Sequence, residues 1–149
     1  MSEAELVEPV RTRTRRVARS QAPVLAVIAV GGGFGALARY GLALALPTHP
    51  GQFPWGTFVA NVTGCFLIGV LMVLITEVWS AHRLVRPFLG VGFLGGYTTF
   101  STYAVETRGL LAPGDVPVAF AYLGGTLVAA LVAVILAVWL TRELTGVAR

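Results

Sequence analysis

The residues best suited to binding chemistry lie in one run, GVGFLGGYTTFSTYAVET, between Gly90 and Thr107. Two successive glycines, Gly95 and Gly96, are followed by hydroxyl side chains at Thr98, Thr99, Ser101 and Thr102. Each glycine weakens a helix by about 1 kcal/mol, and hydroxyl groups offer backbone atoms other hydrogen-bond partners. The run therefore predicts a break in a helix. In a membrane, the freed carbonyl groups need a new partner, and carbonyls of an unwound helix can bind Na⁺.

Two aromatic side chains, Phe100 and Tyr103, are interleaved with these hydroxyl groups. They are three residues apart and therefore share one helical face. Aromatic rings have electropositive edges, so a ring presented edge-on can offer C–H hydrogens to a small anion. Ordinary helix packing is the alternative interpretation of this pair.

A second polar face is expected on the run FPWGTFVANVTGCF, where Thr57, Asn61 and Gly64 have the spacing i, i+4, i+7. An amide side chain inside a membrane is costly unless a helix, water or an ion satisfies its donors. Asn61 therefore either joins two helices or lines an aqueous path.

Other polar residues interrupt apolar segments at isolated positions. Arg39 either reaches toward the membrane interface or draws anions toward an entrance. Glu106 has three open interpretations: it reaches the interface, pairs with Arg108, or lines a pore vestibule. Tyr122 and Thr126 share a face at i, i+4, which suits either helix packing or the lining of a path.

The sequence does not favour an enzyme. His49 and His82 lie in separate loops, and Asp115 is the only aspartate, so a Ser-His-Asp set is not expected. The chain contains no HExxH motif, no GxxxxGK[ST] loop and no pair of carboxylates within one apolar segment. What remains is a lining of hydroxyl groups, one amide and aromatic edges, which suits a small anion that must shed water.

The elements that carry these residues are membrane helices. Apolar residues make up 56% of the 149 residues and charged residues only 12%, with a mean hydropathy of +0.78. A soluble domain is about a quarter charged. Apolar segments of about 20 residues, enough to span a bilayer, are expected at 23–46, 55–78, 87–111 and 116–140.

The sequence thus predicts an all-α membrane protein with four transmembrane helices, the third broken at mid-membrane. The four helices form one transmembrane channel domain, residues 23–141. A flexible basic cytoplasmic tail is expected at 1–22 and a short C-terminal tail at 142–149. Glycine pairs four apart, Gly31 with Gly35 and Gly92 with Gly96, let helices approach closely and favour self-association.

The arginines predict how the chain is oriented. Four spans put both termini on one side of the membrane, and nine of the eleven arginines lie there. Positive charge favours the cytoplasm, so we expect cytoplasmic termini in a multi-pass protein of the cell membrane, and no nucleic-acid partner. The nine are Arg11, Arg13, Arg15, Arg16, Arg19, Arg83, Arg86, Arg142 and Arg149.

Three motifs, GGGFGALARYG, WGTFVANVTGCFLIG and GFLGGYTTFSTY, resemble those of the Fluc (CrcB-like) fluoride channels. The resemblance extends from about Gly31 to Thr141. It implies four-helix subunits in antiparallel, dual-topology dimers, with two fluoride pathways flanking a structural Na⁺ that is not transported. Such channels let fluoride leave the cytoplasm passively, which lowers fluoride toxicity.

The same resemblance assigns roles to residues of this chain. The carbonyls of Gly95 and Thr98 would hold the Na⁺, while Arg39 and Glu106 match residues near the vestibule. Tyr103 stands where the family usually has a second pore phenylalanine. The implied fluoride pathway consists of Asn61, Phe100, Tyr103, Thr57, Ser101, Tyr122 and Thr126.

The arginine excess conflicts with a chain that inserts equally in both orientations. The subunit is therefore expected to pair either with itself, if the bias is overridden, or with an oppositely oriented paralogue. Two other functions are the alternatives to a fluoride channel. A four-helix drug/proton antiporter needs an acidic residue in the first helix, where this chain has Arg39. A non-transporting assembly subunit leaves Asn61 and the TTFST run unexplained.

Overall fold

The computed structural model describes residues 3–112 and 114–147, with side chains from residue 21 onward, and every regular element in these ranges is a helix. The side chains of Arg11–Arg19, and Arg149, lie outside the described part. The elements are α1 (Glu3–Ala45), α2 (Trp55–Val73), the π-helical segments η1 (Leu74–Val78) and η2 (Arg86–Leu94), α3 (Gly95–Tyr97), α4 (Phe100–Leu111) and α5 (Val116–Thr145).

Within the described residues, three helices are long and apolar enough to cross a membrane: Gln21–Ala45, Trp55–Val78 and Val116–Thr145. They correspond to the first, second and fourth predicted spans, and the all-helical class is confirmed. The third expected span, 87–111, is divided among η2, α3 and α4.

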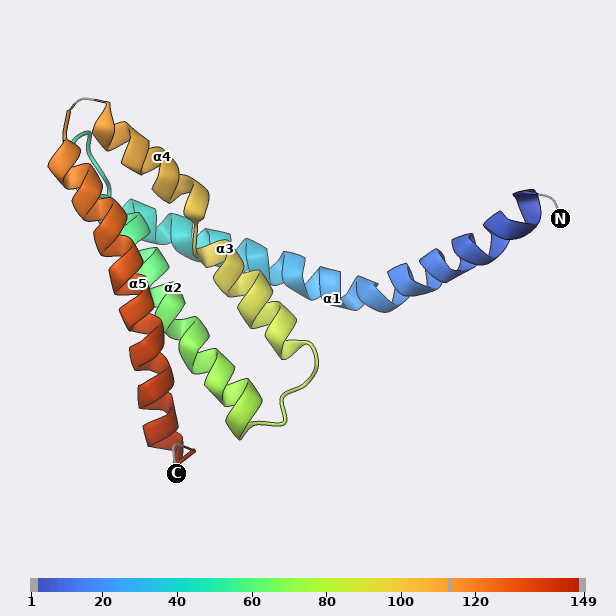
Figure 1. Cartoon of the computed structure of the whole chain (residues 1–149). Coiled ribbons are helices and arrows are strands. Elements are labelled where there is room, and N and C mark those ends of the chain that lie inside the picture. The colour runs from blue at the N-terminus through green and yellow to red at the C-terminus, as the bar shows by residue number, and fades with distance from the viewer. Residues whose placement is uncertain (1–2, 113, 148–149) are drawn as a thin grey trace.

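Helix α1 begins well before the first apolar span. Its backbone is helical from Glu3, where the sequence analysis expected a flexible tail. Arginine, glutamate and alanine are good helix formers, so a charged composition does not by itself prevent a helix. In Figure 1 this end of α1 extends away from the other helices.

The helices pack in two close groups (Figure 1). Helix α2 lies against α5, and α1 lies against η2 and α3, while α4 returns toward α5. The glycine pairs lie where α1 contacts η2 and α3. A Cβ added to Gly31 would lie 2.5 Å from the Phe88 carbonyl oxygen, and one added to Gly92 would lie 2.8 Å from that of Ile28, so a side chain at either position would push the two backbones apart. The small-residue surfaces that favoured self-association are therefore used inside one chain, between α1 and η2.

The interior is narrow and the outer surface is apolar. Leu110, Ala119 and Tyr122 form a buried cluster where α4 meets α5. By contrast, Leu37 of α1 and Ile135 of α5 are 66% and 65% exposed. Exposed apolar side chains on long helices suit contact with lipid.

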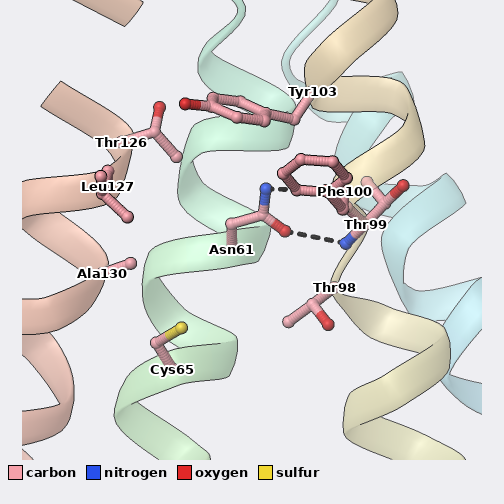
Figure 2. A pocket seen from close by; sticks show the side chains of 9 residues that line it. All are labelled: Asn61, Cys65, Thr98, Thr99, Phe100, Tyr103, Thr126, Leu127 and Ala130. Carbon is pink, nitrogen blue, oxygen red and sulfur yellow. Dashed lines mark hydrogen bonds between the residues drawn. The ribbon is translucent and has the colours of Figure 1, made fainter. Parts of the chain in front are cut away.

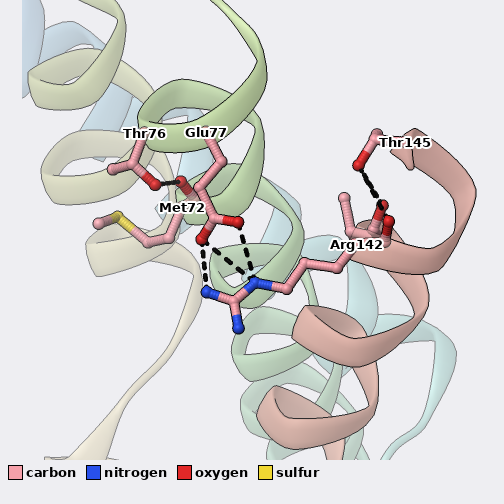
Figure 3. A network of polar contacts seen from close by, with 6 residues as sticks. Met72, Thr76, Glu77, Arg142 and Thr145 are labelled. Carbon is pink, nitrogen blue, oxygen red and sulfur yellow. Dashed lines mark hydrogen bonds and ion pairs between the residues drawn. The ribbon is translucent and has the colours of Figure 1, made fainter. Parts of the chain in front are cut away.

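An ion pair that the sequence analysis did not anticipate joins η1 to α5 (Figure 3). The guanidinium of Arg142 donates to Glu77 through Nη2 at 2.6 Å to Oε1 and through Nε at 2.9 Å to Oε2. The two residues are 65 positions apart. This bidentate ion pair holds η1, which continues α2, against the end of α5.

Candidate functional site

The backbone leaves helical geometry directly after the glycine pair. Helix α3 ends at Tyr97, and Thr98 (φ −81°, ψ 160°) and Thr99 (φ −152°, ψ 126°) are extended before α4 begins at Phe100. Hydroxyl groups satisfy the ends on both sides. Thr98 Oγ1 donates to the Leu94 carbonyl at 2.9 Å, and Thr99 Oγ1 accepts from the Thr102 amide at 3.2 Å, which caps α4.

Asn61 of α2 holds this extended segment from the side (Figure 2). Its Nδ2 donates to the Thr99 carbonyl at 3.0 Å, and its Oδ1 accepts from the Thr99 amide at 2.8 Å. In a continuous helix the Thr99 amide would donate to the Gly95 carbonyl. The Thr99 amide therefore donates to Asn61 instead of to the Gly95 carbonyl.

The predicted polar face of α2 is turned toward the third segment, which consists of η2, α3, the extended residues Thr98 and Thr99, and α4. One turn from Asn61, Gly64 faces Thr98, and a Cβ added to Gly64 would overlap the Thr98 methyl group. Thr57 lies one turn in the other direction, and its hydroxyl donates to Glu106 at 2.9 Å. All three residues at the i, i+4, i+7 spacing thus contact the segment from 98 to 106.

A cavity of about 260 Å³ lies beside the extended segment (Figure 2). One polar atom in it stands out. Thr126 is 4% exposed, and its Oγ1 has no hydrogen-bond partner among the described residues. A buried hydroxyl without a partner can donate to a ligand. The lining consists of Asn61, Cys65, Thr98, Thr99, Phe100, Tyr103, Thr126, Leu127 and Ala130.

This lining brings together four of the residues named for the pathway: Asn61, Phe100, Tyr103 and Thr126. It also contains residues that sequence reasoning did not name. Cys65 follows Asn61 by four residues and Ala130 follows Thr126 by four, so the i, i+4 spacing was the available signal. Thr57, Ser101, Tyr122, Arg39 and Glu106 lie outside this cavity.

The aromatic residues form a short series. The ring centroids of Phe100 and Tyr103 are 5.8 Å apart, and those of Tyr103 and Tyr122 are 5.2 Å apart. Phe100 is 79% exposed, whereas Tyr122 is fully buried. The phenol of Tyr103 donates to the Leu123 carbonyl at 2.6 Å. Its hydroxyl is thus directed to the backbone of α5, and the ring lines the cavity.

Glu106 occupies the other end of this series. Its carboxylate accepts from Thr57 Oγ1 at 2.9 Å and from the Tyr122 hydroxyl at 2.6 Å. It also lines a second cavity of about 400 Å³, together with residues of the 48–54 loop, including His49. Its partners in the structure are these two hydroxyl groups rather than Arg108, and the lining of a pore vestibule stays a prediction.

Arg39 and Ser101 lie near the extended segment without lining the first cavity. Arg39 Nε donates to the Gly96 carbonyl at 3.1 Å, across the contact between α1 and α3. Ser101 is exposed, and its Oγ lies 3.3 Å from Thr99 Oγ1. The guanidinium of Arg39 therefore contacts the backbone beside Gly95.

The site as a whole has a definite chemical character. Hydroxyl, amide and aromatic side chains line the first cavity, and the carboxylate of Glu106 lies at the second. Such groups can exchange for the water shell of a small ion. They offer no activated nucleophile of the kind that covalent catalysis needs.

Comparison with known proteins gives a consistent result. Residues 26–138 match the family described as "CrcB-like protein, Camphor Resistance (CrcB)". The chain is 61% identical over 125 residues to the fluoride-specific ion channel FluC 1 of Streptomyces coelicolor, covering 84% of this chain and 81% of that protein. It is 59% identical over 126 residues to FluC 2 of Nocardia farcinica, covering 85% and 90%.

Proposed function

Since this chain belongs to the CrcB-like protein family, we propose that it is a fluoride-specific ion channel. Relatives that share about three fifths of its residues over most of both chains are named as such channels. Its long apolar helices make it a membrane protein, and its family is one of channels rather than enzymes. The prediction that it is not an enzyme is thereby confirmed.

The observation that carries the proposal is the cavity beside Asn61. The buried Thr126 hydroxyl has no partner among the described residues, and the Phe100 and Tyr103 rings lie at the same cavity. A hydroxyl hydrogen and ring edges are groups that attract a small anion. A path lined this way selects for an ion small enough to be enclosed by them.

The two cavities give this path two ends. An ion entering from the 48–54 loop meets Glu106 first, where Thr57 and Tyr122 hold the carboxylate by their hydroxyl groups. It then passes the ring of Tyr103 into the cavity at Asn61. Fixing the carboxylate keeps its charge to one side of the route.

A structural Na⁺ fits the extended segment. The Thr99 amide donates to Asn61, so the Gly95 carbonyl lacks the hydrogen bond that it would accept in a continuous helix. The Thr98 carbonyl belongs to extended backbone. A Na⁺ bound there supplies a positive charge that stabilises unwound carbonyls. One chain offers two such oxygens, so a second chain related by a twofold axis completes the set in an antiparallel dimer with the break at mid-membrane.

The proposed physiological role follows from passive flow. Fluoride that accumulates when HF enters and dissociates in the cytoplasm leaves through the channel down its gradient, which lowers its toxicity. The termini of the orientation favoured by the arginines are cytoplasmic. The partner is a second copy or an oppositely oriented paralogue.

Liposomes that contain the purified protein test the proposal. We expect fluoride efflux in Na⁺ buffer, measured with a fluoride electrode, and little chloride efflux under the same gradient. Protein-free liposomes serve as the baseline. Absence of fluoride flux, from the lone subunit and from a co-expressed pair, would overturn the proposed function.

A further inference from the structure

Helix ends normally leave carbonyl groups without amide donors. Around the end of α3, three carbonyls accept hydrogen bonds from side chains. The Leu94 carbonyl accepts from Thr98, through both its amide and its hydroxyl at 2.9 Å. The Gly96 carbonyl accepts from Arg39 and the Thr99 carbonyl accepts from Asn61. The carbonyls of Gly95 and Thr98 lie between these satisfied groups.

We propose that Arg39 is a positioning residue, which fixes the Gly96 carbonyl and so leaves the Gly95 and Thr98 carbonyls directed to a sodium ion. This inference rests on the proposed function. It differs from both roles that the sequence leaves open for Arg39, reaching the membrane interface or drawing anions toward an entrance. The guanidinium acts on the backbone of the break, 57 positions away in the chain.

The packing of α1 explains why Arg39 can reach this carbonyl. Gly32 and Gly35, about two turns and one turn before Arg39, bring α1 into backbone contact with the third segment at Gly96 and Phe93. Arg39 itself is half-buried. A charged donor in these surroundings makes a stronger hydrogen bond than a neutral one, so the contact is able to hold a backbone turn.

Charge and position have opposite consequences for Na⁺. A guanidinium near a sodium site repels the ion, so removal of the charge alone would strengthen Na⁺ binding. Removal of a positioning contact releases the Gly96 carbonyl and weakens Na⁺ binding. The sign of the change in Na⁺ dependence therefore distinguishes the two roles.

The experiment measures thermal unfolding of the purified full-length protein in detergent. NaCl is titrated against N-methyl-D-glucamine chloride at constant ionic strength, and the readout is the Na⁺ concentration that gives half of the maximal stabilisation. For Arg39→Met, which keeps the apolar stem, we expect this concentration to rise about tenfold. For Arg39→Lys, which keeps the charge but loses the planar donor, we expect a smaller rise.

Arg108→Met is the matched control, because it removes one arginine from an exposed position of α4. Its Na⁺ dependence should equal that of the original protein. Amide hydrogen exchange of the peptide 94–103 supplies a second readout. Exchange there should increase in Arg39→Lys, which remains informative if Arg39→Met does not fold.

The outcomes separate this inference from the proposed function. If the original protein shows neither fluoride flux nor Na⁺-dependent stabilisation, the proposed function fails. If the original protein shows both, but the Na⁺ requirement of Arg39→Met is unchanged or lower, the positioning role alone is overturned. Unchanged exchange at 94–103 in Arg39→Lys, with an unchanged Na⁺ requirement, overturns it equally.

Discussion

Asn61 and Thr99 exchange two hydrogen bonds across the gap between α2 and the extended segment, at 3.0 Å and 2.8 Å. The side-chain oxygen of Asn61 thereby replaces the acceptor that a continuous helix would supply to the Thr99 amide. The same residue lines the cavity, so the extended backbone and the proposed pathway depend on one side chain. Of the two interpretations of Asn61 that the sequence leaves open, the structure shows the contact between segments, and the lining of an ion path stays a prediction.

Asn61→Asp should reduce fluoride flux by roughly a hundredfold. A carboxylate loses the donor to the Thr99 carbonyl and puts a negative charge on the anion route, where repulsion amounts to a few kcal/mol at short range. Liposome efflux gives the measurement. Asn61→Gln is neutral, so its flux separates the charge from the altered hydrogen bonds. Flux of Asn61→Asp equal to that of the original protein would remove Asn61 from the path.

Phe100→Ile should lower fluoride flux at least about tenfold while the protein still assembles. Isoleucine retains the apolar bulk of the side chain and loses the electropositive ring edge. Size-exclusion chromatography checks assembly, and liposome efflux checks function. Phe34→Ile is the control, because Phe34 is an exposed ring on α1, away from the cavity. Equal flux in both variants would show that the Phe100 ring does not contact the ion.

Tyr103→Phe should leave fluoride flux within about twofold of the original. The phenol donates to the Leu123 carbonyl rather than into the cavity, so its loss removes a contact between α4 and α5 and keeps the ring. We expect the free energy of unfolding to fall by about 1 kcal/mol. Thermal unfolding and efflux on the same preparation make the comparison. A large loss of flux would mean that the hydroxyl itself serves the ion.

Tyr122→Phe and Glu106→Gln should destabilise the protein in a coupled manner. Tyr122 is fully buried and donates to Glu106 at 2.6 Å, so each single change should cost about 1–3 kcal/mol. The double variant should cost less than the sum by about 0.5–3 kcal/mol. Denaturant unfolding of the three variants completes the cycle. Strict additivity would contradict the hydrogen bond.

Reporters fused to the C-terminus should give a mostly cytoplasmic signal. Nine of eleven arginines lie on the side of the termini, which favours one orientation. The measurement compares a cytoplasmic and a periplasmic reporter on otherwise identical chains. A purely cytoplasmic signal in a cell without a paralogue would contradict the homodimer, whereas equal signals would contradict the predicted bias.

The sequence was most informative where a residue type has one strong physical preference. Apolar length located the second span, 55–78, which agrees with the bounds in the structure. The glycine and hydroxyl run drew attention to Thr98 and Thr99, where the backbone is extended. Both results follow from local properties that a short stretch of chain carries by itself.

Contacts between distant segments were less accessible. The partner of Glu106 depends on how α2 and α5 approach α4, which no local pattern determines, and the ion pair of Glu77 with Arg142 joins positions 65 apart. The spacing of the glycine pairs predicts a close helix contact but does not identify the partner helix, which is why self-association was expected where the contact lies within one chain. The backbone before residue 21 is helical in a segment expected to be a flexible tail, since a polar, charged composition does not by itself exclude a helix.

The close fit of Gly31 against Gly92 bears on how the protein is made. Since α1 and η2 meet within one polypeptide, this backbone contact can form as soon as both have entered the bilayer. Biogenesis of one chain up to that stage needs no second chain. In the proposed dimer, encounter with an oppositely inserted protomer would then be a later event, limited by diffusion in the plane of the membrane.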